Sequence, residues 1–135
     1  MTLEQFITKN LGQKLDYDGV YGAQCVDLFR CYSRDVLGIK EHTGAVEGAK
    51  DLFLRYSELI KEQKYFEKLG KTRHPLYGDI CIWDGTQQNK YGHVAIFLGE
   101  CKDGIFVLEQ NGITQNGVEL NVRSRLNLLG FLRKK

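Results

Sequence analysis

The chain has 135 residues, 42% of them hydrophobic, and a formal net charge of +2. This length supports one domain with a proper core and is too short for two ordinary domains, so we expect a single domain over residues 1–135. Lys and Arg are interspersed with Asp and Glu, which argues against a nucleic-acid-binding stripe.

No apolar run reaches the roughly 18 residues that a membrane span needs. The segment Met1 to Gln5 lacks the basic and apolar regions of a signal peptide, so we expect synthesis in the cytoplasm without one. Four cysteines are few for this length and come without a secretory segment. We therefore expect them to be free thiols.

The first predicted element is a helix that Thr2 caps and Gly12 ends. We expect it to pack beside the next helix. Its apolar stripe consists of Leu3, Phe6, Ile7 and Leu11.

An acidic turn follows, in which Asp16, Asp18 and Asp27 stand at relative positions 1, 3 and 12. With backbone carbonyls available near positions 5 and 7, this is the oxygen spacing of a calcium loop. The match is imperfect, because an EF-hand loop has Gly at position 6 and Glu at position 12, where this chain has a tyrosine and an aspartate. A solvated turn explains the same residues, since Asp-Gly pairs are ordinary turn formers.

Cys25 opens a second predicted helix, which Gly38 closes. At a helix N-terminus the unpaired N–H groups and the positive dipole end favour a thiolate and can also bind an oxyanion. The alternative is a buried cysteine that packs as a small hydrophobe. A partner base is needed to decide between the two. The helical spacing is carried by Val26, Phe29, Tyr32 and Val36.

Residues 38–48 are predicted to form a loop, in which we interpret His42 as a surface histidine. Ala45 to Ile60 has helical spacing, and Lys64 to Leu69 is predicted to be a short strand. After Pro75 the residue pattern changes from that of helices to that of extended strands. Further strands are expected at Asp79–Trp83, His93–Leu98, Ile105–Glu109, Glu119–Arg123 and Leu129–Leu132, with the first two of these paired as a hairpin. Helices followed by strands predict an α+β domain with an antiparallel sheet.

His93 begins one predicted strand, where its imidazole can face a helix end and act as the base for Cys25. Glu109 and Asn111 end the next strand two residues apart, so their side chains share one face. Glu109 would fix the tautomer and direction of the ring, and Asn111 would assist in orienting it or would polarise the substrate. The alternatives are a core or surface histidine and, for Asn111, an ordinary turn residue before a glycine.

This order of helix-Cys, strand-His and strand-Glu-x-Asn resembles the CHAP family, the cysteine, histidine-dependent amidohydrolase/peptidase branch of the papain-like NlpC/P60 superfamily. The likeness covers nearly the whole chain. Its motifs are Tyr21-Gly22-Ala23-Gln24-Cys25-Val26-Asp27, Gly78-Asp79-Ile80, Tyr91-Gly92-His93-Val94-Ala95-Ile96, Glu109-Gln110-Asn111-Gly112 and Leu129-Gly130-Phe131-Leu132-Arg133.

The resemblance implies a papain-like fold and cleavage of peptidoglycan, either within its peptides or at the bond joining them to the glycan. Phage endolysins and bacterial autolysins do this at the cell wall. It implies Cys25 as nucleophile, His93 as base, and Glu109 and Asn111 in support. The oxyanion would be met by the Cys25 N–H with Gln24 or Tyr21, and Trp83 is a further candidate for substrate contact. These residues form the expected active site.

The resemblance also implies a structural calcium ion, because some phage members bind calcium in the loop before the cysteine. Its ligands would be the carboxylates of Asp16, Asp18 and Asp27 and the carbonyls of Val20 and Gly22. Some relatives have an imidazole at the position of Gly22, whereas this chain offers only a main-chain oxygen there.

Two other functions remain open at this point. One is a cell-wall binding module without chemistry, whose groove would be lined by Tyr17, Tyr21, Trp83 and Tyr91. The other is an intracellular cysteine protease or transglutaminase-like enzyme that uses the same residues on proteins. We expect a monomer, either a lone catalytic domain or one module of a longer lysin. The sequence does not choose between N-acetylmuramoyl-L-alanine amidase and endopeptidase.

Overall fold

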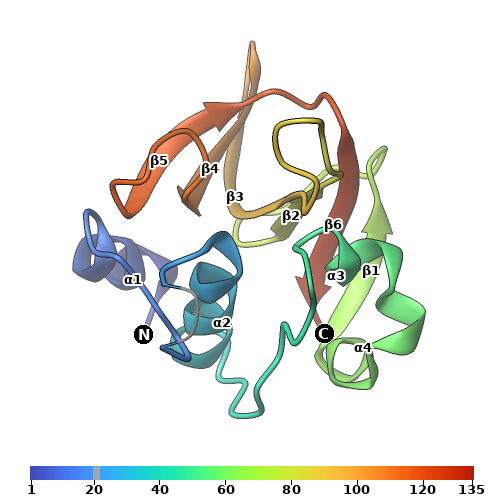
Figure 1. The fold of residues 1–135 in the computed structure, drawn as a ribbon, viewed down its shortest axis with the longest axis horizontal. Coiled ribbons are helices and arrows are strands. Elements are labelled where there is room, and N and C mark those ends of the chain that lie inside the picture. The colour runs from blue at the N-terminus through green and yellow to red at the C-terminus, as the bar shows by residue number, and fades with distance from the viewer. Residues whose placement is uncertain (20–21) are drawn as a thin grey trace.

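A computed structural model describes residues 1–19 and 22–135 of the chain. The helices of the described residues all lie before Phe66, joined by long loops, and the rest of the chain forms a six-stranded antiparallel sheet (Figure 1). The predicted α+β class is therefore confirmed.

The first two helices lie where the sequence predicted them. Helix α1 spans Leu3–Asn10, and the Thr2 side chain caps it by accepting a hydrogen bond from the Gln5 N–H at 3.1 Å. Helix α2 spans Cys25–Asp35. Leu11 does not complete the apolar stripe of α1, because the chain turns away after Asn10 and leaves this side chain 42% exposed.

The continuous helix predicted from Ala45 to Ile60 is wrong. The segment instead contains α3 (Asp51–Leu54), a 3₁₀ turn (Tyr56–Glu58) and α4 (Ile60–Tyr65). Tertiary hydrogen bonds override the periodicity at both ends: the Lys50 N–H donates to the Tyr91 carbonyl at 3.0 Å, and the Tyr56 hydroxyl donates to the Phe66 carbonyl at 2.6 Å. The strand expected from Lys64 accordingly begins only at Phe66.

The sheet has the strand order β1-β6-β2-β3-β4-β5. Strands β2 and β3 pair as the predicted hairpin, with Ile80 opposite Ile96 and Trp83 opposite His93. The last strand returns between β1 and β2, which nothing in the sequence indicated. The strands span β1 Phe66–Gly70, β2 Ile80–Trp83, β3 His93–Cys101, β4 Gly104–Gln110, β5 Val118–Arg123 and β6 Leu128–Lys134.

Hydrophobic side chains are buried on both faces of the central strands. Helix α2 packs against β3 on one face, where Phe29, Val94 and Ile96 belong to one core cluster. On the other face the curled sheet buries a second cluster that includes Ala95 and Phe97. With both its faces covered, β3 is a rigid support for the residue that begins it.

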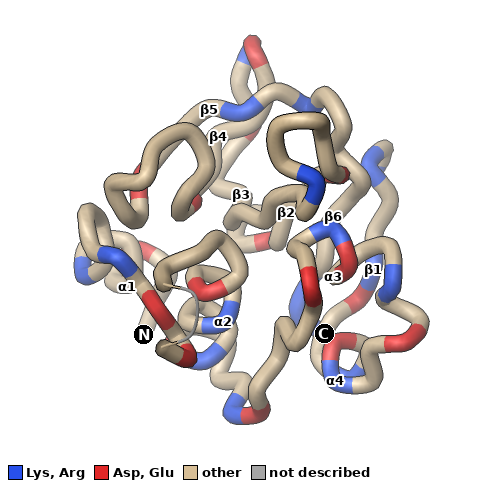
Figure 2. Tube along the Cα trace, viewed as in Figure 1, with Lys and Arg blue, Asp and Glu red and all other residues tan. Residues whose placement is uncertain are grey.

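Lys and Arg are interspersed with Asp and Glu along the described trace, and no stripe of one sign follows any element that the structure describes (Figure 2). This agrees with the charge pattern of the sequence. Among the described residues, no helix combines the length and the apolarity that crossing a bilayer requires. The four cysteines are free, as expected.

Candidate active site

The packing of α2 on β3 brings Cys25 and His93 together from distant parts of the sequence. Cys25 is the first residue of α2 and His93 is the first residue of β3. The thiol is half-buried, and the imidazole is buried. A hydrogen bond links the thiol to the imidazole, so the nucleophile and the base that the sequence predicted do meet.

The pKa of the Cys25 thiol is lowered, although burial by itself would raise it. The hydrogen bond and positive charge of His93 outweigh the burial, with help from the backbone N–H groups of Val94 and Val26. The pKa of His93 is raised: burial opposes its protonation, but hydrogen bonds to Cys25 and Glu109 and the negative charge of the thiolate favour it. Both shifts favour a thiolate–imidazolium pair.

Glu109 holds the far side of the imidazole. Its Oε1 lies 2.9 Å from His93 Nε2. Because an ionised carboxylate only accepts hydrogen bonds, Nε2 carries the proton and Nδ1 is left for the thiol. Glu109 is completely buried, which raises its pKa, yet the pKa is lowered overall by His93, Arg123 and Asn121. This matches the predicted role of Glu109.

Two partners of Glu109 were missed by the sequence analysis. Asn121 Nδ2 donates to Glu109 Oε2 at 2.7 Å, and Arg123 Nε lies 3.0 Å from Glu109 Oε1. Both residues belong to β5, which pairs with the strand of Glu109. The available signal was the alternation in β5, which places Glu119, Asn121 and Arg123 on one face of the strand.

Gly112 gives the Glu109 carboxylate its space. A Cβ atom at this position would overlap all three atoms of the carboxyl group. The carboxylate cannot move aside freely, since His93 and Asn121 hold its two oxygens. The sequence analysis treated Asn111-Gly112 as a turn signal, and the structure adds this close approach.

Asn111 does not orient the imidazole as one expectation had it. Its Nδ2 donates a short hydrogen bond to the carbonyl of Ala23, so Asn111 ties the end of β4 to the segment before Cys25. Its backbone has a φ of 55°, a left-handed conformation that asparagine tolerates better than most residues. Orientation of the ring therefore falls to Glu109, and a contact between Asn111 and the substrate stays a prediction.

Gln110 is a second structural tie that the sequence analysis did not single out. Its buried side chain accepts from the Leu15 N–H at 2.7 Å and donates to the carbonyls of Leu15 (2.8 Å) and Gln24 (2.7 Å). Gln110 and Asn111 thus fix the backbone that leads into Cys25 to the strand that carries Glu109.

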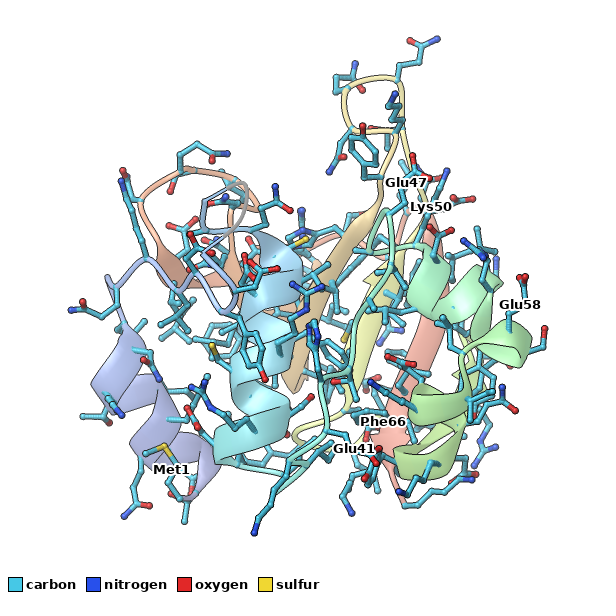
Figure 3. All side chains as sticks on the ribbon, turned by 60° about the horizontal axis from the view of Figure 1, so that its bottom comes forward. Met1, Glu41, Glu47, Lys50, Glu58 and Phe66 are labelled. Carbon is cyan, nitrogen blue, oxygen red and sulfur yellow. The ribbon has the colours of Figure 1, made fainter. Side chains whose placement is uncertain are left out.

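A groove of about 650 Å³ opens in front of Cys25. Its wall opposite α2 comes from residues 46–49 and from the loop between β2 and β3, beside which Figure 3 shows Glu47 and Lys50. Gln24 and Asn111 lie at the Cys25 end. The described residues that line the groove are Asp18, Gln24, Cys25, Val26, Asp27, Arg30, Val46, Glu47, Gly48, Ala49, Asn89, Tyr91, Gly92 and Asn111.

Trp83 does not line the groove, contrary to the expectation of a substrate contact. It is buried behind the imidazole, with ring centroids 5.8 Å apart, and its Nε1 donates to the Ser124 carbonyl at 3.0 Å. Tyr17 stacks on His42 and does not line the groove, whereas Tyr91 does. Tyr21, expected near the oxyanion, lies outside the described residues. Without Trp83 and Tyr17, the aromatic groove of a binding module is not formed by the part of the chain that is described.

The three aspartates of the predicted calcium loop converge. One carboxylate oxygen from each of Asp16, Asp18 and Asp27 lies within 4.8 Å of the others. Ligands about 2.3–2.6 Å from one ion can be separated by this distance, so the set fits a calcium ion. Arg30 Nη1 approaches the same group, 3.2 Å from Asp18 and 3.3 Å from Asp27. Val20 lies outside the described residues.

Comparisons with known proteins agree with this geometry. The family model described as CHAP domain matches residues 14–111, from the acidic loop to Asn111. The chain belongs to the CHAP domain family. The match includes Cys25, His93 and Glu109, the three residues that the fold brings together.

This CHAP domain is 30% identical over 114 residues to endolysin PlyTW of Staphylococcus phage Twort (strain DSM 17442 / HER 48). The alignment covers 80% of the chain but only 23% of that endolysin, so the chain spans about a quarter of the length of its relative.

Two solved structures share its fold. The wild-type endolysin LysIME-EF1 superposes with a TM-score of 0.66 at 19% identity, covering 96% of this chain and 61% of that one. Ly7917, solved with the hydrolyzing product of MDP, gives 0.57 at 23% identity, covering 82% of this chain and 53% of that one. These likenesses confirm the papain-like α+β fold.

We expect replacement of Glu109 by Gln to move the alkaline limb of the kcat/KM profile to lower pH. Glu109 raises the pKa of His93, so its removal lets the imidazolium lose its proton earlier as the pH rises. Glu100→Gln, at an exposed glutamate of β3, is the control. Wall-hydrolysis rates from pH 5 to 10 are the measurement, and an unmoved alkaline limb would contradict the assignment.

We expect Gly112→Ala to lower activity while the fold persists. The new methyl group displaces a carboxylate that three side chains hold, at a cost of about 1–3 kcal/mol for an overpacked site. Gly99→Ala is the matched control, because a Cβ there meets nothing within 4 Å. Thermal unfolding and hydrolysis rates are compared. Equal activity in the two variants would contradict the prediction, because it would show that the Glu109 carboxylate can move without loss of activity.

Proposed function

We propose that this CHAP domain is a peptidoglycan hydrolase that cleaves an amide or peptide bond of the Gram-positive cell wall by a thiol mechanism. One observation carries the proposal: a thiol with a lowered pKa stands at a helix N-terminus, hydrogen-bonded to a buried imidazole, in the lining of a groove. Family membership and the endolysin relative point to the wall as substrate. The partner is therefore peptidoglycan, and the site of action is the bacterial wall.

In the first step, the Cys25 sulfur attacks the substrate carbonyl carbon and forms a C–S bond. The developing oxyanion is stabilised by the Cys25 N–H at the start of α2, with Gln24 beside it in the groove. His93, as imidazolium, gives its proton to the leaving nitrogen, and the C–N bond breaks. The products of this step are a free amine and a thioester on Cys25.

In the second step, neutral His93 takes a proton from water, and the resulting hydroxide attacks the thioester carbonyl. The C–S bond breaks and the thiolate–imidazolium pair is restored. The carboxylic acid that leaves gives its proton to solvent and becomes a carboxylate. Throughout both steps the Glu109 carboxylate keeps the imidazole in one tautomer and one direction. Both N-acetylmuramoyl-L-alanine amidase and endopeptidase cleavage follow this scheme.

We expect Cys25→Ser to abolish wall lysis without unfolding the domain, because a serine hydroxyl is far less acidic than the thiol. Cys101→Ser, at an exposed free cysteine far along the chain, is the matched control. The measurements are turbidity of purified Gram-positive walls, circular dichroism, and mass spectrometry of the muropeptides, which names the bond. Lysis retained by Cys25→Ser would refute the mechanism.

The same assay separates the rival functions. A wall-binding module would sediment with walls and leave them intact, whereas a general cysteine protease would release amino ends from casein rather than from walls. The ordered Cys25–His93–Glu109 chain favours chemistry over binding alone.

Calcium is the cofactor that we propose, held by the carboxylates of Asp16, Asp18 and Asp27 with main-chain oxygens of Val20 and Gly22. When bound, the ion would supply positive charge that neutralises the converging aspartates and stiffens the loop before Cys25. Asp27 also stabilises this loop directly, because its Oδ2 accepts a hydrogen bond from the Gln24 N–H at 2.9 Å. The pKa of Asp27 is raised by burial and by the charge of Asp18, against the Gln24 N–H and the charge of Arg30, which lower it.

We expect calcium to raise the melting temperature and Asp18→Asn to remove this effect. A ligand at 100 times its Kd stabilises the folded state by about 2.7 kcal/mol. Asp103→Asn, in the exposed turn between β3 and β4, is the control. Calorimetric titration with calcium chloride, and unfolding with and without EDTA, are the measurements. Absence of heat and of any thermal shift would refute the site.

We further propose that the domain acts as a monomer and works as one module of a longer lysin. The relative of which it matches about a quarter supports the modular arrangement. Mass measurement in solution tests the oligomeric state.

A further inference from the structure

A row of four side chains crosses the sheet behind the nucleophile. Trp83, His93, Glu109 and Arg123 come from β2, β3, β4 and β5, which are successive neighbours in the sheet. Trp83 lies directly opposite His93 in the strand register. Each member contacts the next: Trp83 and His93 by their rings, His93 and Glu109 at 2.9 Å, Glu109 and Arg123 at 3.0 Å.

Arg123 closes this row on itself. Its guanidinium carbon lies 5.3 Å from the centre of the Trp83 ring, at cation–π distance, while Nε faces the Glu109 carboxylate. Trp83 is held in place by a hydrogen bond from its Nε1 to the carbonyl of Ser124, the residue after Arg123. The guanidinium therefore lies between the indole ring of Trp83 and the buried carboxylate of Glu109.

The contact between Arg123 and Glu109 is ionic. Nε is buried and close to Oε1, but it lacks the alignment of a hydrogen bond to any described atom. The groups that face the carboxylate are His93 from β3, Asn121 and Arg123 from β5, and none of these is negatively charged. Without Arg123, the buried carboxylate would have His93 as its one charged partner among them.

We propose that Arg123 is a positioning residue for the reaction: its guanidinium, held against Trp83, keeps the Glu109 carboxylate charged and in the one place where it orients His93. This inference rests on the proposed function. It concerns the turnover step and not substrate binding, because Arg123 is absent from the groove lining.

The test compares Arg123→Met with Arg125→Met. Arg125 stands two residues further on and makes an ion pair of its own, with the surface residue Glu100 at 2.7 Å, so it matches the loss of one paired arginine. On purified Gram-positive peptidoglycan we expect Arg123→Met to lower kcat on the order of 10-fold and to leave KM unchanged. This is less than the roughly 10²–10⁴-fold contribution of a positioned acid–base group, because Glu109 and His93 are still present. Arg125→Met should resemble the wild type, and Arg123→Lys should recover part of the loss.

A spectroscopic readout separates positioning from mere stabilisation. The chain has three histidines, so ¹⁵N-labelled imidazole signals can be assigned by substitution. In the wild type we expect a slowly exchanging Nε2–H signal from His93, and in Arg123→Met we expect faster exchange and a shifted resonance. Glu109→Ala, which removes the acceptor, provides the reference spectrum for a broken bond.

The outcomes are distinct. An Arg123→Met enzyme with wild-type kcat and His93 signal overturns the proposal, even when its melting temperature has fallen. If Arg123→Met does not fold, Arg123→Gln takes its place, since it also removes the positive charge. Wild-type kcat and an unchanged His93 signal in that variant overturn the proposal equally. If the wild type and Arg125→Met release no muropeptides, the proposed function fails instead.

Discussion

The chemistry of this domain depends on one buried carboxylate. Glu109 is inaccessible to solvent, and a charge in that position costs several kcal/mol unless partners compensate for it. The compensation comes from His93, Asn121 and Arg123, and His93 is the proposed base. The need to satisfy the carboxylate thus fixes the imidazole, and the imidazole in turn favours the thiolate of Cys25.

The fold keeps Glu109 and its partners out of the groove, while Cys25 lines it. The nucleophile lies on a helix and the base on a strand that is buried on both faces, so their relative position depends on packing of regular elements rather than on loops. Gln110 and Asn111, at the end of the Glu109 strand, hold the backbone before Cys25. The two halves of the site are joined by these side chains, which explains how a loop of turn residues can carry a nucleophile.

The acidic loop precedes Cys25 in the chain, and its proposed function is to bind calcium and not to take part in the reaction. Asp27 caps the start of α2, and Arg30 contacts both Asp27 and Asp18. Arg30 also donates to the carbonyls of Thr43 and Gly44, which precede the groove wall. A cation bound by the aspartates would therefore affect a residue that links the loop to the wall of the groove, although it would not touch the reacting atoms.

The sequence by itself determined the local elements and the identities of the reacting groups. Apolar spacing placed α1 and α2, and β-rich runs between turn signals placed β2 to β6 to within a few residues. The position of Cys25 at a helix start, with His93 and Glu109 on strands, followed from these elements. These features are encoded by residues near one another in the chain, so a linear pattern shows them.

Only the tertiary structure decided how these elements combine. The break between α3 and α4, the return of β6 between β1 and β2, the burial of Trp83 behind His93, and the contact of Arg123 with Glu109 all depend on neighbours that are distant in sequence. No local pattern distinguishes a tryptophan that lines a groove from one that supports an imidazole, because the two share the same strand alternation. The position of the tryptophan depends on which face of the sheet packs against α2, and packing of the whole core determines that face.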